Sequence, residues 1–284
     1  MNDLTLSTER APHTHTSEGI RSRMADMLLA LTPLAVAAAC FHGVDWLLNL
    51  AAALAVSAAA QVLFNLPFGR RVGLFDLSFA VTGALCALLL PAQAPFWAAA
   101  IAAAAAQLIR ALFGGLGRNW LNPALTGVCL VYACTLAGDG ALQALVRVEP
   151  IAPMSRLLGC ATLGPAMTCS ALLVPVGWLY LFCKKLAKPI FSLTFLLAMA
   201  APQLIFGMDV LQTGILGPAL AAALYCGADS VSTPMFHSNG LLLGLLLGTA
   251  VGVVRLLLGL DVSFAAILLT GPLARVLDAW AARD

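Results

Sequence analysis

The sequence predicts an all-α polytopic membrane protein of about ten transmembrane helices, and three observations support this fold class. Of the 284 residues, 61% are hydrophobic and 10% are charged, whereas a soluble domain carries about 25% charged residues to cover its surface. The hydrophobic residues form blocks of roughly 17 to 22 residues, the length that crosses a hydrocarbon core as a helix. The basic residues also separate between two sides. A soluble enzyme is therefore excluded, and a net charge of +2 does not favour nucleic acid as a partner.

Apolar blocks bounded by charged residues, Pro or Gly place the helices in order. The expected spans are 24–42, 45–65, 74–91, 95–113, 122–137, 157–182, 190–207, 210–228, 239–258 and 262–280. Residues 1–23 form a polar leader without the apolar core of a signal peptide, residues 24–280 form the transmembrane domain, and residues 281–284 form the C-terminal end. Ten spans place both termini on the same side of the membrane.

The distribution of Lys and Arg tests this count, because basic residues near span ends accumulate in the cytoplasm. With a cytoplasmic N-terminus, one side receives twelve of them and the other side receives three: Arg147, Arg156 and Arg255. This separation predicts both termini in the cytoplasm and a location in the bacterial inner membrane.

A short internal similarity indicates a five-plus-five inverted repeat. Arg110 ends the fourth block in Gln-Leu-Ile-Arg-Ala-Leu-Phe-Gly-Gly, and Arg255 ends the ninth in Gly-Val-Val-Arg-Leu-Leu-Leu-Gly, 145 residues later. A duplicated unit of five helices inserts upside down and builds its site from broken helices near the membrane midplane. Chance similarity in Leu/Gly-rich sequence is the alternative.

The first candidate site is the run Gly-Gly-Leu-Gly-Arg-Asn-Trp-Leu-Asn-Pro-Ala at 114–124. Asn122 before Pro123 is typical of a helix N-cap followed by a first-turn proline. Gly115 and Gly117 allow the backbone to approach a ligand closely, and Asn119 and Asn122 could hold a polar ring edge. A Gly-rich turn that only caps a helix is the alternative interpretation.

The second candidate site is the run Gly-Ala-Asp-Ser-Val-Ser-Thr-Pro-Met-Phe-His at 227–237. Its carboxylate, hydroxyls and proline interrupt two apolar blocks, and such a break can direct Asp229 and Thr233 toward the bundle interior. An ordinary loop between helices remains the alternative. The sequence contains no catalytic triad, paired-carboxylate arrangement or metal-ligand spacing, so we expect no catalytic or metal site, and any reaction would belong to a cofactor.

These motifs resemble the family that contains the D subunit of the Rnf electron-transport complex and the B subunit of the sodium-pumping NADH:quinone oxidoreductase. The run at 114–124 is similar to the family signature, and Ala-Pro-His-Thr-His at 11–15 is similar to the Ser-Pro-His motif of Rnf D subunits. Asp-Ser-Val-Ser-Thr-Pro at 229–234 looks like their Asp-x-Val-Thr-x-Pro motif, and a Gly-rich helix with Arg255 follows.

The resemblance implies a membrane subunit of a redox-driven Na⁺ or H⁺ pump that works with other membrane and peripheral subunits and is not catalytic alone. It also implies a flavin, FMN or riboflavin, with Asn119 and Asn122 at the flavin edge. Family members attach FMN to the Thr of a Ser-Gly-Ala-Thr motif, but the corresponding loop at 138–156 contains no Thr, and its one hydroxyl is Ser155. We therefore expect a flavin without a covalent link. A flavin-free channel or transporter, or a scaffold subunit, on the same fold is the alternative.

Overall fold

The computed structural model describes residues 19–68, 74–115, 117–136, 153–160, 164–207, 217–229 and 231–282. Within these ranges the chain is helical and contains no strand, apart from an isolated bridge between Pro91 and Pro165. The α-helices are α1 (Ile20–Asn65), α2 (Ser78–Leu89), α3 (Phe96–Leu112), α4 (Pro123–Leu136), α5 (Pro153–Leu158), α6 (Leu173–Cys183), α7 (Pro189–Ile205), α9 (Pro218–Ala221), α10 (His237–Leu258) and α11 (Ser263–Ala281). Short 3₁₀ turns occupy Leu66–Phe68, Leu74–Asp76 and Ala166–Cys169, and a π-helical turn at Ala222–Cys226 continues α9.

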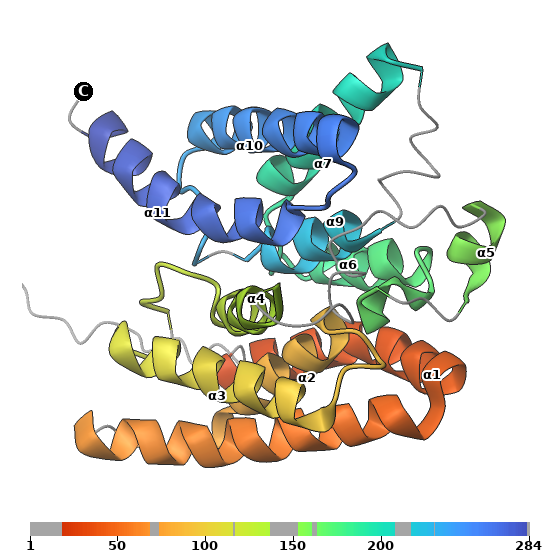
Figure 1. The fold of residues 1–284 in the computed structure, drawn as a ribbon. Coiled ribbons are helices and arrows are strands. Elements are labelled where there is room, and N and C mark those ends of the chain that lie inside the picture. The colour runs from red at the N-terminus through yellow and green to blue at the C-terminus, as the bar shows by residue number, and fades with distance from the viewer. Residues whose placement is uncertain are drawn as a thin grey trace, which may run out of the picture.

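The helices form two groups with a shared centre (Figure 1). Helices α1, α2 and α3 lie together on one side, helices α7, α10 and α11 lie on the other, and α4, α6 and α9 lie between them. Helix α3 packs on α1 and α4, while α10 packs on α7 and α11. The two halves of the chain therefore meet along the central helices.

Helix α1 contains the first two expected spans. Its 46 residues would extend about 69 Å at 1.5 Å per residue, roughly twice the thickness of a hydrocarbon core. Gly43 has non-helical angles (φ 68°, ψ −143°), so the helix is broken at the place where the sequence separates 24–42 from 45–65. Three described helices, α1, α10 and α11, are long and apolar enough to cross a membrane.

Several other segments are shorter than a full span. Helix α2 has 12 residues, and α9 with its π turn covers only 218–226 of the expected block 210–228, of which 210–216 lie outside the described residues. The prediction of one continuous helix at 157–182 is wrong. Helix α5 ends at Leu158, a 3₁₀ turn follows at Ala166–Cys169, and α6 begins only at Leu173.

The backbone around this 3₁₀ turn is buried, although it is not α-helical. The amide of Ala166 donates to the carbonyl of Leu90 (2.9 Å), and the amide of Cys160 donates to the carbonyl of Cys169 (2.8 Å). Irregular backbone is tolerated inside a membrane protein only where neighbouring protein satisfies its polar groups. Packing, and not local sequence, therefore allows the break.

Glycines bring α10 and α7 into close contact. Gly240, Gly244, Gly248 and Gly252 recur every fourth residue on one face of α10, and all four are buried. A Cβ atom at Gly244, Gly248 or Gly252 would lie within 3.1 Å of the α7 backbone. Small residues at this spacing allow membrane helices to pack backbone against backbone.

Candidate functional site

The site begins in the turn between α3 and α4. Gly114, Gly115 and Gly117 adopt positive φ angles of 108°, 98° and 84°, a region that residues with a Cβ rarely occupy. The amide of Gly115 donates to the carbonyl of Arg110 (2.9 Å) and ends α3. Phe113 and Trp120 stack across the turn with ring centroids 6.1 Å apart.

The predicted N-cap of α4 is confirmed. Asn122 Oδ1 accepts a hydrogen bond from the amide of Leu125 (3.2 Å), and the Asn122 carbonyl accepts one from the amide of Thr126 (2.9 Å). Pro123 occupies the first helical position. The cap fixes where Asn122 and the adjoining turn lie relative to α4.

The second half of the site is the segment 227–236 between the π turn and α10. The Asp229 carboxylate accepts hydrogen bonds from the amide of Val231 (3.2 Å) and the hydroxyl of Ser232 (3.3 Å). The Thr233 hydroxyl donates to the carbonyl of Asp229 (2.6 Å). This local network holds Asp229 in a folded turn rather than in an open loop.

The two candidate segments meet at one pocket, which we call the site pocket. It is an open hollow with about 600 Å³ of empty space, part of which is solvent at its mouth. Its lining combines polar side chains with apolar ones from α1, α2 and the start of α4. The lining residues are Met24, Met27, Val81, Thr82, Leu85, Arg110, Gly117, Asn119, Asn122, Pro123, Ala124, Tyr225, Asp229 and Val231.

Two polar groups at this pocket are buried without a partner. Within the described part of the chain, no hydrogen-bond partner reaches the Oδ1 of Asn119 or the Nε and Nη1 of Arg110. A buried polar group left unsatisfied costs about 1–3 kcal/mol. These groups are therefore candidates for binding a ligand, because no described residue satisfies them.

The charges at the pocket are partly balanced. Asp229 lies in the connection between helices. Burial raises the pKa of its carboxyl above the ordinary value. The groups that oppose this rise are the Val231 amide, the Ser232 hydroxyl, Arg110 and Lys188. Arg110 and Asp229 are thus within electrostatic range of each other. Among the described residues, however, no ion pair within 4.0 Å joins them.

Four of the six residues singled out in the sequence line the site pocket: Gly117, Asn119, Asn122 and Asp229. Gly115 supports the turn by ending α3. Thr233 instead lines a neighbouring pocket at the beginning of α7 and α10. Sequence analysis used Arg110 only for topology, although an ionisable residue at the end of an apolar block is itself an indication of function.

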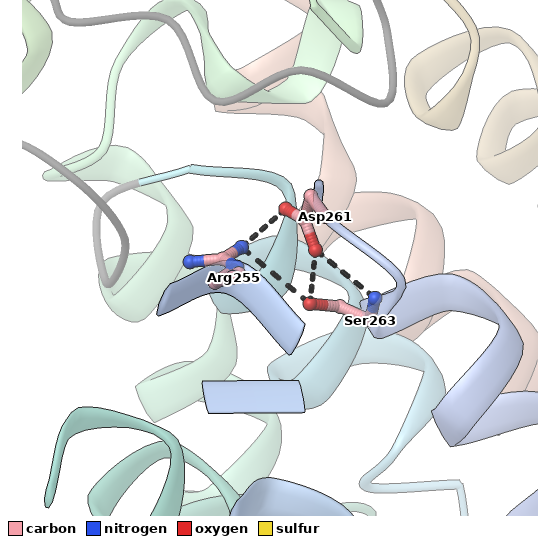
Figure 2. Close-up of polar contacts among 3 residues, drawn as sticks. All are labelled: Arg255, Asp261 and Ser263. Atoms are coloured by element: carbon pink, nitrogen blue, oxygen red, sulfur yellow. Dashed lines mark hydrogen bonds and ion pairs between the residues drawn. The ribbon is translucent and has the colours of Figure 1, made fainter. Parts of the chain in front are cut away.

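A second buried charge cluster differs from the site pocket because a carboxylate contacts its arginine directly (Figure 2). The Arg255 guanidinium pairs with the Asp261 carboxylate, whose other oxygen accepts hydrogen bonds from the hydroxyl and the amide of Ser263. The side chains of Arg255 and Asp261 are 3% and 4% exposed. This cluster closes the turn between α10 and α11.

A set of closely packed apolar helices, some of them broken, is typical of an integral membrane protein. Comparison with known families makes this class specific. The chain belongs to the NQR2, RnfD, RnfE family, whose sequence model matches residues 7–284.

Named relatives agree with this assignment. The chain is 26% identical to the D subunit of the Na⁺-translocating ferredoxin:NAD⁺ oxidoreductase complex of Acetobacterium woodii, over 90% of the chain and 87% of that relative. It is 24% identical to the D subunit of the ion-translocating oxidoreductase complex of Alcanivorax borkumensis, over 94% of the chain and 92% of that relative. The B subunit of the Na⁺-translocating NADH-quinone reductase of Klebsiella pneumoniae is 29% identical over 56% of the chain and 40% of its own length.

Proposed function

We propose that this protein is the D-type membrane subunit of an ion-translocating electron-transport complex, and that its site pocket holds a flavin without a covalent bond. One observation carries the proposal. Two segments far apart in the sequence, 114–124 and 227–237, close around a single pocket in which buried polar atoms of Asn119 and Arg110 have no partner among the described residues. A planar ring with a polar edge and an apolar body matches a lining that combines polar side chains with apolar ones.

The residues at the pocket have distinct roles in this proposal. Gly117 lies at the pocket wall, and a Cβ there would meet no atom within 4 Å, so the backbone of the turn can approach a flat ligand. Asn119 and Asn122 contact the polar edge of the ring, and Met24 and Met27 pack on its apolar part through flexible side chains. The bound flavin would supply the electron transfer, while the protein binds, orients and shields the ring.

The absence of Thr from the loop at 138–156 supports the noncovalent form. Residues 137–152 lie outside the described part of the chain, so this part of the proposal rests on sequence. Any flavin that the protein carries is therefore expected to dissociate when the protein unfolds.

The proposal includes ten spans arranged as an inverted repeat in the bacterial cytoplasmic membrane, with both termini in the cytoplasm and partner subunits alongside. Arg110 near the end of α3 and Arg255 near the end of α10 hold corresponding places, and each of these helices packs on a preceding and a following helix. Near the start of α1, Asp26 pairs with Lys184 (3.7 Å) at the end of α6, which agrees with a common side for these two ends.

Flavin analysis of the complex tests the proposal. The complex is purified with its partner subunits and denatured, and the flavin released to solution is measured by fluorescence after chromatography. We expect flavin in the soluble fraction and less of it in the Asn119→Ala complex, while Asn65→Ala, outside the pocket, serves as a matched control. A flavin band that stays with this chain on a denaturing gel contradicts noncovalent binding. A flavin-free protein that conducts ions by itself in liposomes supports a transporter instead.

A further inference from the structure

Two cysteines meet at the break between α5 and α6. The amide of Cys160 donates to the carbonyl of Cys169 (2.8 Å), and the hydroxyl of Ser170 donates to the carbonyl of Leu157 (3.2 Å). These two bonds join the chain before the break to the chain after it. The segments that carry the two cysteines therefore lie side by side, although the cysteines are nine positions apart in the sequence.

The contact between these segments suits a disulfide. Residues joined by a backbone hydrogen bond across paired chains have Cα atoms about 5.5 Å apart, and disulfides form where the Cα atoms lie about 4.4–6.8 Å apart. The thiols of Cys160 and Cys169 also interact electrostatically, so the side chains as well as the backbones are near each other. Cys169 is fully buried, whereas Cys160 is only half-buried and can be reached from outside the fold.

A third cysteine, Cys40 on α1, lies at the same end of the fold, and we call the three residues the thiol cluster. The ring of Phe41 occupies the space that a Cβ atom of Gly159 would need, so α1 lies directly against the residue before Cys160. Cys40 interacts electrostatically with Cys169, but less strongly than Cys160 does. Cys160 is therefore the better partner for Cys169.

The thiol cluster is remote from the site pocket. Cys40 lies 14 residues beyond Asp26 in α1, about 21 Å at 1.5 Å per residue, and Asp26 pairs with Lys184 at the other end of the fold. In the proposed topology the basic residues place the Lys184 end in the cytoplasm. The thiol cluster then faces the periplasm, where disulfides form and persist.

We propose that Cys160 and Cys169 form a disulfide at the outer face of the membrane, by exchange with a low-molecular-weight disulfide. The Cys160 thiolate attacks one sulfur of the small disulfide and displaces a first thiolate, and the Cys169 thiolate then attacks Cys160 Sγ and displaces the second. Two protein thiols are oxidised, and one small disulfide is reduced to two thiols that take up the protons lost by the protein. Only the choice of membrane side rests on the proposed function.

Cleavage at methionine tests the pair. The complex, purified with its partner subunits, is treated with oxidised glutathione, its remaining thiols are alkylated, and the chain is cleaved with cyanogen bromide. This reagent cuts after Met154, Met167 and Met199. Cys160 is then in fragment 155–167, and Cys169 is in fragment 168–199. We expect mass spectrometry to show these two fragments joined, and to show them separate after treatment with a thiol reductant.

Variants exclude the other thiols. Cys183 shares fragment 168–199 but lies at the far end of α6, so Cys183→Ser is the matched control and should keep the joined fragments, whereas Cys169→Ser should lose them. Joined fragments that persist in Cys169→Ser overturn the pair. A link from fragment 155–167 to fragment 28–154, which contains Cys40, overturns the choice of partner, and no link at all in oxidised glutathione overturns the disulfide.

The membrane side is measured on spheroplasts, which are reduced and then treated with a membrane-impermeant maleimide. We expect the reagent to label Cys160 and to prevent the link, whereas labelling only after lysis overturns the location at the outer face. Flavin released from the same complex separates this inference from the proposed function. Joined fragments in a flavin-free complex overturn the flavin and leave the disulfide in place, and a flavin-containing complex without the link overturns only the disulfide.

Discussion

Replacing Gly248 by Ala should force α10 away from α7, whereas the same change at Gly240 should be tolerated. A Cβ at Gly248 would lie 2.4 Å from the Phe195 carbonyl oxygen and 2.8 Å from the Ala198 Cβ. A Cβ at Gly240 would meet only Ile190 Cγ2 at 3.7 Å, an ordinary contact. The two positions lie on the same face of one helix, so the two substitutions differ only in the atoms that the new Cβ contacts.

The size of the effect follows from this geometry. Relief of the contact at Gly248 requires the helices to separate by about 1 Å, which forfeits roughly a quarter to a half of the local dispersion attraction. Overpacking of this kind costs about 1–3 kcal/mol, and the better helix propensity of Ala returns about 1 kcal/mol. We expect a net loss of up to about 2 kcal/mol for Gly248→Ala and a gain of up to about 1 kcal/mol for Gly240→Ala, so the two variants should differ by about 1–3 kcal/mol.

Thermal unfolding in detergent, followed by circular dichroism, measures the difference. A loss of 1 kcal/mol lowers the midpoint temperature by about 2–4 °C in a chain of 150–250 residues, so the Gly248→Ala protein should unfold a few degrees below the Gly240→Ala protein. The reasoning is refuted if both variants unfold at the same temperature, because α10 and α7 would then not be in backbone contact.

Three further predictions concern the site and its supports. Gly271→Ala on α11 would place a Cβ 1.8 Å from the Trp120 carbonyl oxygen, so it should displace the turn that carries the site and lower the flavin content of purified complex by about tenfold or more. Asp229→Asn should remove the pH dependence of folding stability that the Asp229 carboxyl causes. Because the folded-state pKa of Asp229 is raised, the folded protein binds more protons than the unfolded chain. Wild-type stability should therefore fall as the pH rises from the ordinary Asp pKa to the raised pKa. The midpoint temperature of the variant should change less across this pH window. Asn49→Ala removes donors to the carbonyls of Ala92 (3.1 Å) and Ala94 (2.8 Å) in the buried turn between α2 and α3, and denaturant unfolding should show a loss of about 1–3 kcal/mol, whereas an unchanged midpoint would mean that water replaces the bonds.

Local rules predicted the parts of the fold that local chemistry decides. The cap at Asn122 and the break near Gly43 follow from residue types whose backbone preferences dominate their surroundings. The apolar stretch of α10 is also predicted, because its composition gives an unbroken span in any context. In each of these cases a few neighbouring residues are enough to predict the structure.

The break at 157–182 could not be predicted in this way. Apolar sequence fits a continuous span and a buried irregular segment equally well, and the choice depends on partners such as the Leu90 carbonyl, which accepts the Ala166 amide. The importance of Arg110 was missed for a related reason. Its position beside Asp229 and the turn that holds Asn119 comes from tertiary structure, and no local pattern predicts that these segments line one pocket.

The two arginines, Arg110 and Arg255, differ in the residues of the turn that follows each of them. After Arg255, the chain turns through Asp261 and Ser263, so the guanidinium is neutralised within its own hairpin and the turn is locked. After Arg110, the chain turns through glycines and then Asn119, which offers an amide instead of a carboxylate. A buried charge without a full counter-ion is costly, and the ligand of the proposed function would offset that cost. Under the proposed function, the residues of the turn, and not the helices that precede it, therefore decide which end of the protein binds a ligand.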